Sequence, residues 1–231
     1  MRFGARIEAV IIDLDGTLLD TAPDLAEAAN RMLGDLDMPL RTGQEVASFV
    51  GRGIENLVAR SIGAAHAADP ATLANALEVF NRHYAAVSGV HVRVFAGVRE
   101  GLAAFRAQGL KLACITNKAG RFTLPLLDQL ELRGNFSLVV SGDSLPRKKP
   151  DPLPLLHVCS QFGVAPGAAL MIGDSPNDAQ AARAAGCPVA CVPYGYREGL
   201  EVRELDCDVI VSTLAEAASL VQGSNLQHAA P

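Results

Sequence analysis

The sequence predicts an α/β fold, in which a parallel sheet carries helices on both faces and an all-helical segment is inserted. Short runs rich in Val and Ile alternate with amphipathic stretches in the second half of the chain, and a purely helical stretch separates the first such run from the others. About half of the 231 residues are apolar and 19% are charged, so the chain can fill a core and is not disordered. Strands that alternate with helices favour parallel pairing through right-handed crossovers.

The first strand is expected at Ile7 to Leu14, where a run dense in Val and Ile leads into Asp-Leu-Asp-Gly. Such a run is typical of a buried strand that ends at a turn. Helical patterns follow over Pro23 to Leu36, near Ile54 to Ser61 and over Pro70 to Val87. In the first of these, apolar residues recur on one face and a proline stands in the first turn.

The chain is expected to form two domains, because no strong strand signal interrupts residues 20–92. Residues 1–19 and 93–231 are predicted to form the sheet-containing core. Residues 20–92 are predicted to form a helical cap that emerges from the carboxyl edge of the first strand. In open sheets of this kind, ligands bind at the carboxyl ends of the strands.

The alternation of strands and helices continues to the end of the chain. Further strands are expected at Lys111–Ile115, Leu138–Val140, Ala168–Ile172, Val189–Val192 and Val209–Val211. Further helices are expected at Val98–Gln108, Arg121–Leu130, Pro152–Phe162, Asn177–Ala185 and Thr213–Val221. The last helix opens with Thr213-x-x-Glu216, the pattern of a capping box, and the small polar tail from Gly223 to Pro231 is expected to be frayed.

Composition and charge exclude several classes of partner. The chain has 20 basic and 25 acidic residues and a net charge of −5, which argues against a general nucleic-acid binder. The longest early apolar run has four residues, whereas a membrane helix needs about 20. The five cysteines are scattered and form no CxxC pair, so we expect free thiols, no zinc site and a cytoplasmic location.

Two aspartates follow the first strand. Asp13 and Asp15 point the same way because side chains alternate along a strand. Two adjacent carboxylates repel each other unless a cation or a shared proton relieves them, and Mg²⁺ prefers such oxygen ligands. The alternative interpretation is a polar turn in which Asp15 and Gly16 are the turn pair.

Polar groups also stand at the ends of later strands. Thr116 and Asn117 offer a hydroxyl and an amide for an anion, although both are ordinary loop residues. Lys149 precedes Pro150 and can serve as a point charge for phosphate, or can belong to a solvated basic loop. Asp174 stands where a strand turns into a helix, and so does the second acid, Asp178. These two acids suit a second carboxylate pair, or helix caps.

Taken together, these residues resemble the four motifs of the haloacid dehalogenase superfamily. The resemblance covers essentially the whole chain, and it implies a Rossmann-like core with a helical cap after the first motif. Closer stretches resemble bacterial phosphoglycolate phosphatases: 13–21 (DLDGTLLDT), 116–127 (TNKAGRFTLPLL), 173–186 (GDSPNDAQAARAAG) and Tyr194-Gly195-Tyr196. One departure is Ala119, where the family pattern has proline.

The resemblance implies a phosphomonoesterase with Asp13 as nucleophile and Asp15 as general acid and base. It further implies Mg²⁺ as cofactor, held by the Asp13 carboxylate, the Asp15 backbone carbonyl and Asp174. Thr116, Asn117 and Lys149 would bind the phosphoryl group, and Asp178 would act on Lys149 or on a metal-bound water.

The expected partner is a small phosphorylated metabolite, with 2-phosphoglycolate as the implied substrate and with neither nucleic acid nor membrane as partner. In the cap, Gly51 and Gly53 allow close backbone approach, and Arg52 between them can pair with a substrate carboxylate or remain a solvated loop arginine. Three alternatives stay open: a phosphatase for another small ester, a phosphosugar mutase, and a catalytically inactive binding module. The oligomeric state is expected to be a monomer or a homodimer.

Overall fold

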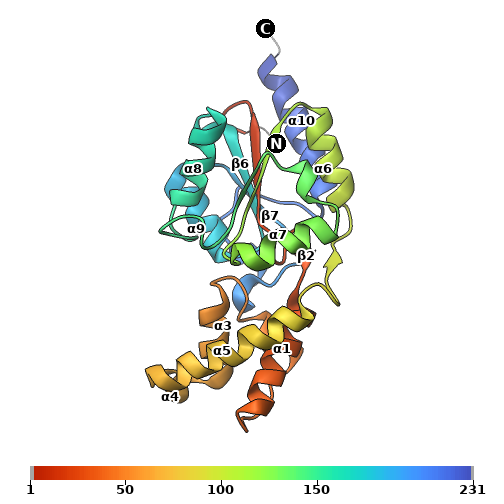
Figure 1. The fold of residues 1–231 in the computed structure, drawn as a ribbon. Coiled ribbons are helices and arrows are strands. Elements are labelled where there is room, and N and C mark those ends of the chain that lie inside the picture. The colour runs from red at the N-terminus through yellow and green to blue at the C-terminus, as the bar shows by residue number, and fades with distance from the viewer. Residues whose placement is uncertain (1–2, 230–231) are drawn as a thin grey trace.

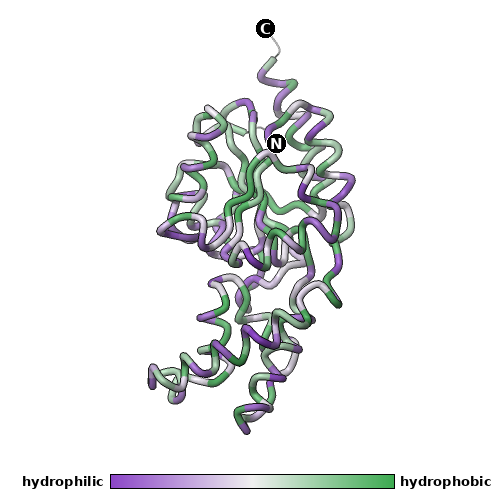
Figure 2. The backbone as a smooth tube through the Cα atoms, viewed as in Figure 1, coloured by the Kyte–Doolittle hydropathy of each residue, from purple (hydrophilic) through white to green (hydrophobic). Residues whose placement is uncertain are grey.

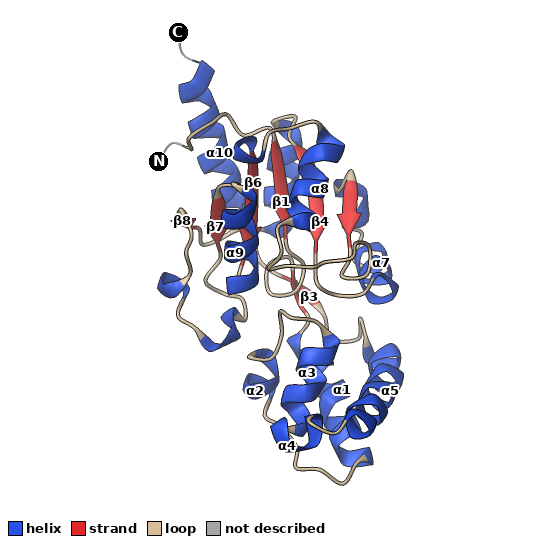
Figure 3. Ribbon diagram, turned by 90° about the vertical axis from the view of Figure 1, so that its left-hand side faces the viewer, coloured by secondary structure: helices blue, strands red, loops and turns tan. Residues whose placement is uncertain are grey.

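A computed structural model describes residues 3–229 and contains a six-stranded sheet. This sheet lies above a group of helices in the view of Figure 1. The strand order is β5-β4-β1-β6-β7-β8, and every neighbouring pair in this sheet is parallel. The predicted α/β class is therefore confirmed. Figure 3 shows the order of the strands from a second direction, with helices on either side of the sheet.

The strands agree closely with the expected positions. Those of the sheet are β1 (Ala9–Ile12), β4 (Lys111–Ile115), β5 (Leu138–Val140), β6 (Ala169–Gly173), β7 (Val189–Cys191) and β8 (Val209–Ile210). A separate antiparallel pair joins β2 (Leu19–Asp20) to β3 (Arg93–Val94). This pair lies where the chain leaves the sheet domain and returns to it, and the sequence analysis did not predict it.

The helices divide into two groups. Those before β3 are α1 (Ala22–Asp35), α2 (Gly43–Ala47), α3 (Ile54–Ile62), α4 (Ala64–Ala67) and α5 (Pro70–Val87). We call these five helices and their connections the helical insertion. Those after β3 are α6 (Val98–Ala107), α7 (Gly120–Gln129), α8 (Leu153–Phe162), α9 (Pro176–Ala185) and α10 (Leu214–Ala229). The short helices α2 and α4 were not expected.

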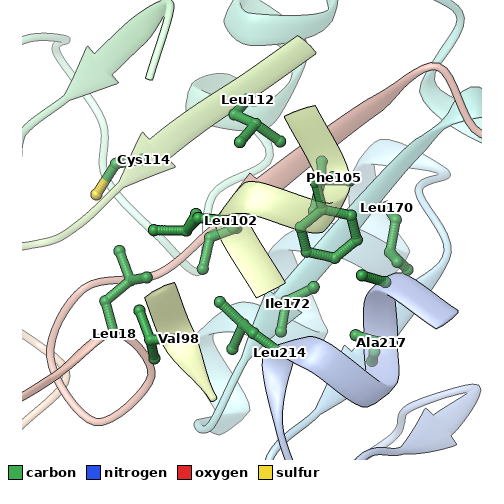
Figure 4. Close-up of a cluster of buried hydrophobic side chains, with 14 of the residues drawn as sticks. Leu18, Val98, Leu102, Phe105, Leu112, Cys114, Leu170, Ile172, Leu214 and Ala217 are labelled. Atoms are coloured by element: carbon green, nitrogen blue, oxygen red, sulfur yellow. The ribbon is translucent and has the colours of Figure 1, made fainter. Parts of the chain in front are cut away.

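The sheet is covered on both faces because consecutive residues of a strand point in opposite directions. Val10 and Ile12 of β1 pack in a cluster with α6 and α10, whereas Ala9 and Ile11 pack in a second cluster with α8 and α9. Figure 2 shows the hydrophobic residues concentrated in the central strands. Figure 4 shows part of the first cluster, including Leu102, Phe105, Leu112, Leu170, Ile172 and Leu214.

The helical insertion has a hydrophobic core of its own. Met32 of α1, Val58 of α3 and Phe80 of α5 are fully buried within it. Phe122 of α7 also belongs to this cluster, and its ring lies 4.7 Å from that of Tyr84 on α5. The insertion therefore packs directly on the sheet domain beside β4.

The carboxyl-terminal tail corrects the sequence analysis. Helix α10 continues to Ala229, whereas the sequence predicted its end at Val221 and a frayed tail. Ser224 accepts a hydrogen bond from the backbone of Phe3, and Asn225 both donates to and accepts from the backbone of Ile7. These contacts between the two ends of the described chain stabilise a segment whose local composition favours disorder. Residues 230 and 231 of the predicted tail lie outside the described residues.

Candidate active site

The candidate site lies where the topology of the sheet reverses. The chain runs from β1 to β4 and β5 on one side, and the strands β6, β7 and β8 lie on the other side. Ile12, the last residue of β1, pairs with Cys114 of β4 and with Ile172 of β6. The residues that follow these three strands are therefore brought together at one carboxyl edge, where open sheets bind ligands.

A buried lysine organises the centre of this edge. The Nζ atom of Lys149 lies 2.6 Å from Oδ1 of Asp13, 2.6 Å from Oδ1 of Asp178 and 3.0 Å from the carbonyl oxygen of Ile115. The side chains of Lys149 and Asp178 are 2% and 0% exposed, so solvent does not screen this ion pair. All three N–H groups of the ammonium are used in these bonds.

Asp174 is held beside this group by the loops that follow β1 and β7. Its Oδ1 atom accepts a hydrogen bond from the hydroxyl of Thr17 at 2.9 Å, and Oδ2 accepts one from the backbone of Tyr196 at 2.7 Å. Two positions that pack against Asp174 require glycine. A Cβ atom on Gly16, whose φ is +91°, or on Gly195 would lie 2.3 Å from Oδ2 of Asp174.

The donor set of the site fits a hard divalent cation. Carboxylate oxygens of Asp13, Asp174 and Asp178 lie within 4.8 Å of one another, and all three residues are buried. Fully ionised, these three carboxylates and the ammonium of Lys149 carry a net charge of −2, which one divalent cation balances. Oxygen-only ligands are those that Mg²⁺ prefers.

Asp178 differs from the other two acids in its contacts. Its Oδ2 atom accepts hydrogen bonds from the backbone of Asp174 and from both the backbone and the hydroxyl of Ser175, while Oδ1 contacts Lys149. Asp178 thus caps the start of α9 and positions Lys149 at the same time. Asp13 and Asp174 remain as the carboxylates with room for a cation.

Burial dominates the electrostatics of the acids. It raises the pKa of Asp13 well above its usual range, and the attraction of Lys149 opposes this effect. Burial and then the charge of Asp178 raise the pKa of Asp174 to about 7. Burial disfavours the charged form of Lys149, but the carboxylates of Asp13 and Asp178 outweigh it and raise the pKa of the lysine. Lys149 alone therefore supplies too little positive charge to keep the pKa values of both Asp13 and Asp174 in their usual range.

Asp15 lies next to Asp13 but has a different environment. Nζ of Lys118 lies 2.8 Å and 3.0 Å from its two carboxylate oxygens, and the hydroxyl of Thr21 donates to Oδ1 at 2.6 Å. The Lys118 ammonium also lies 5.3 Å from the ring centroid of Tyr84, on helix α5 of the insertion. In the sequence analysis Lys118 is only part of the stretch 116–127 and has no assigned contact.

Thr116 and Asn117 stand at the end of β4, as expected, but they differ in availability. The hydroxyl of Thr116 lines the same cavity as Asp13 and accepts a hydrogen bond from the backbone of Lys118 at 3.1 Å. The Asn117 amide donates to the carbonyl oxygens of Lys149 and Gly51, each at 2.8 Å. Asn117 therefore ties the end of β4 to the helical insertion.

The insertion covers the cavity with the loop before α3. Gly51 and Gly53 line the cavity together with Asp13, Asp15 and other site residues. Arg52 is not among the lining residues, and its Nε atom lies 3.0 Å from Oε2 of Glu198. Its side chain is 55% exposed. In this structure the guanidinium of Arg52 thus contacts a carboxylate of the protein outside the cavity, and its pairing with a substrate carboxylate stays a prediction.

Tyr196 is a positioning residue that sequence reasoning did not single out. Its hydroxyl accepts hydrogen bonds from the backbone of Thr21 at 2.7 Å and of Ala22 at 2.9 Å, and it donates to Asp20 at 2.9 Å. Its own backbone N–H holds Asp174. The sequence analysis named Tyr194-Gly195-Tyr196 only as a stretch that resembles the family. That resemblance is the one sequence signal that marked Tyr196.

The comparison with family models identifies the class of enzyme to which this fold and site belong. The family model for "Haloacid dehalogenase-like hydrolase" matches residues 10–192. The chain therefore belongs to the haloacid dehalogenase-like hydrolases, as the motifs predicted. Among residues 3–229, no helix combines the length and the apolar character needed to cross a membrane.

Comparison with known proteins gives matches over nearly the full length. A phosphoglycolate phosphatase of Nitrosospira multiformis is 56% identical over 230 residues, which cover 97% of this chain and 100% of that protein. A phosphoglycolate phosphatase of Thiobacillus denitrificans is 54% identical, covering 95% and 97%. The crystal structure of a predicted phosphoglycolate phosphatase from Haemophilus somnus is 31% identical with a TM-score of 0.89, covering 95% and 100%. These likenesses support phosphatase activity.

Proposed function

We propose that this hydrolase is a Mg²⁺-dependent phosphomonoesterase that converts 2-phosphoglycolate to glycolate and phosphate. The observation that carries the proposal is the contact of Asp13 with Lys149 next to Asp174, at the end of the central strand. The substrate is supported by the names of the relatives from Nitrosospira multiformis and Thiobacillus denitrificans.

In the first step, a carboxylate oxygen of Asp13 attacks phosphorus, and the bond between phosphorus and the ester oxygen breaks. The product is an aspartyl-phosphate on Asp13, and this replaces one difficult displacement with two easier ones. Lys149 fixes the carboxylate through Oδ1 and offsets the negative charge of the approaching phosphoryl group. Thr116 also lines the cavity, and its hydroxyl is a further hydrogen-bond donor for the phosphoryl group.

Asp15 acts as the general acid and then as the general base of the reaction. It gives a proton to the leaving ester oxygen, and it then takes a proton from the water molecule that attacks the phosphorus of the aspartyl-phosphate. That second attack releases phosphate and regenerates the carboxylate of Asp13. Thr21 and Lys118 orient Asp15 through hydrogen bonds to its carboxylate.

Asp13 and Asp174, with the backbone carbonyl of Asp15, are the residues that would hold Mg²⁺. When bound there, the ion would offset the repulsion between the negative charges of the substrate phosphate and of these acids. Asp178 keeps Lys149 and the start of α9 in place, and Asn117 ties this edge to the insertion. Phosphoryl transfer depends mainly on such positioning and charge stabilisation.

The test is a panel of phosphate esters with the purified chain, read as released inorganic phosphate. The panel contains 2-phosphoglycolate, 3-phosphoglycerate, a hexose phosphate and an aryl phosphate, each with Mg²⁺ and with a chelator. We expect the highest kcat/KM for 2-phosphoglycolate and loss of all activity with the chelator. A higher kcat/KM for another ester contradicts the substrate, and full activity with the chelator contradicts the metal. Transfer of phosphate between positions of a sugar without release indicates a mutase instead.

A further inference from the structure

We propose that Lys118 binds the carboxylate of the substrate and is thereby the residue that selects a carboxylate-bearing phosphate ester. The inference rests on the proposed function, because it assigns a partner to the part of 2-phosphoglycolate that leaves with the ester oxygen. The sequence analysis assigned the same contact to Arg52, whose side chain does not line the cavity.

The positive charges around the cavity point to Lys118. Two lysines line the cavity within the described residues, Lys118 and Lys149. Lys149 uses its three N–H groups on Asp13, Asp178 and the carbonyl oxygen of Ile115. Lys118 uses two hydrogen bonds, both to Asp15. An ammonium has three N–H donors, so Lys118 can engage a further acceptor without giving up Asp15.

The position of Lys118 corresponds to the leaving-group side of the reaction. Its Nζ atom lies 2.8 Å from Oδ1 of Asp15, the residue that is proposed to protonate the ester oxygen. In 2-phosphoglycolate, the carboxylate carbon is separated from that oxygen by a single methylene group. A substrate whose ester oxygen faces Asp15 therefore places its carboxylate within reach of the Lys118 ammonium.

The surroundings of Lys118 make the contact selective. The side chain is 3% exposed, and the ammonium lies 5.3 Å from the ring centroid of Tyr84, within the range of a cation–π contact. The side chain of Tyr84 interacts with this ammonium, and its buried hydroxyl has no other hydrogen-bond partner among the described residues. A charge contact in such a dry place between the insertion and the sheet domain is stronger than one at the surface. A neutral group in place of the carboxylate forfeits this contact.

A purely structural role for Lys118 predicts a different outcome. If the lysine only holds Asp15 in position, its removal slows every phosphate ester by the same factor. If it binds the substrate carboxylate, its removal lowers kcat/KM far more for esters that bear a carboxylate. The ratio of two substrates therefore separates the two roles, whereas the activity on one substrate does not.

The experiment compares 2-phosphoglycolate with its neutral isostere 2-phosphoglycolamide. We expect the unmodified chain to prefer the carboxylate by about 100-fold in kcat/KM, the scale of a desolvated charge contact. Lys118→Met lowers this preference to below about fivefold, whereas Lys118→Arg keeps most of it because the charge remains. Lys111→Met is the matched control, since Lys111 is the first residue of β4, at the end of the strand away from Lys118, and donates to the carbonyl of Phe162. It leaves the preference unchanged.

An unchanged preference in Lys118→Met overturns the proposal, even if its total activity falls. Should Lys118→Met lack the circular dichroism of a folded protein, Lys118→Gln gives the same comparison, because it keeps a hydrogen-bond donor towards Asp15 and loses only the charge. Failure of the proposed function gives a separate result. In that case the unmodified chain itself shows no preference for 2-phosphoglycolate in the panel of esters.

Discussion

Replacement of Lys149 by methionine tests the arrangement of the site through both stability and turnover. Methionine has a similar length and no charge, so Lys149→Met removes the ammonium without a large change of volume. The carboxylates of Asp13 and Asp178 lose hydrogen bonds of 2.6 Å, and the carbonyl of Ile115 loses one of 3.0 Å. Loss of one partner of a buried ion pair costs about 3–5 kcal/mol.

The lower end of this range applies here, because Asp178 keeps three hydrogen bonds from Asp174 and Ser175. We therefore expect a loss of about 3 kcal/mol in the free energy of unfolding. For a chain of this size, such a loss lowers Tm by about 6–12 °C. Added Mg²⁺ should raise the Tm of the variant more than that of the unmodified chain, since the cluster of three carboxylates then has no internal counter-charge.

The assay combines differential scanning calorimetry, with and without Mg²⁺, and phosphate release at saturating substrate. Turnover should fall by about 10²–10³-fold or more, since a charge that stabilises the transferring group is lost. Lys111→Met serves again as the control and should change stability by no more than about 0.5 kcal/mol. A Tm shift for Lys149→Met no larger than that of the control, or near-normal turnover, would refute this account of the site.

Two further substitutions probe single roles. Asp13→Asn should reduce phosphate release on the order of 10⁴-fold or more while the circular dichroism stays that of the folded chain, because the amide is no nucleophile; near-normal turnover of a variant verified by mass would exclude Asp13 as nucleophile. Arg52→Ala should change KM for 2-phosphoglycolate by less than about fivefold, since the pair of Arg52 with Glu198 is half exposed and contributes about 0–1 kcal/mol. A rise of KM by a much larger factor would show that Arg52 binds the carboxylate of the substrate.

The elements that the sequence predicted best are those with a strong local pattern. The strands at 111–115 and 138–140 and the helix at 70–87 agree with the structure residue for residue. Buried parallel strands are continuous apolar runs, and an amphipathic helix repeats its apolar face, so each pattern is complete within its own segment. The strands β2 and β3 have two residues each and pair across more than seventy residues, so no local pattern reveals them.

For the candidate site, too, the sequence predicts some features and not others. Asp13, Thr116, Lys149 and Asp174 could be expected at one edge because parallel strands bring their carboxyl ends together. The partners of the side chains could not be read from the sequence. The carboxylate that engages Arg52 belongs to Glu198, which lies 146 positions further along the chain. Composition and spacing carry no information about a contact over such a separation.

The polar contacts between the helical insertion and the sheet domain also bear on the chemistry. Asn117 joins Gly51 to the loop of Lys149, and Tyr196 joins the start of α1 to Asp174. Lys118 lies between Asp15 and the ring of Tyr84. The same side chains therefore contact both the helical insertion and the residues of the candidate site. The proposed recognition of the substrate at Lys118 therefore takes place where the insertion meets Asp15, because Lys118 contacts Asp15 and lies near the ring of Tyr84.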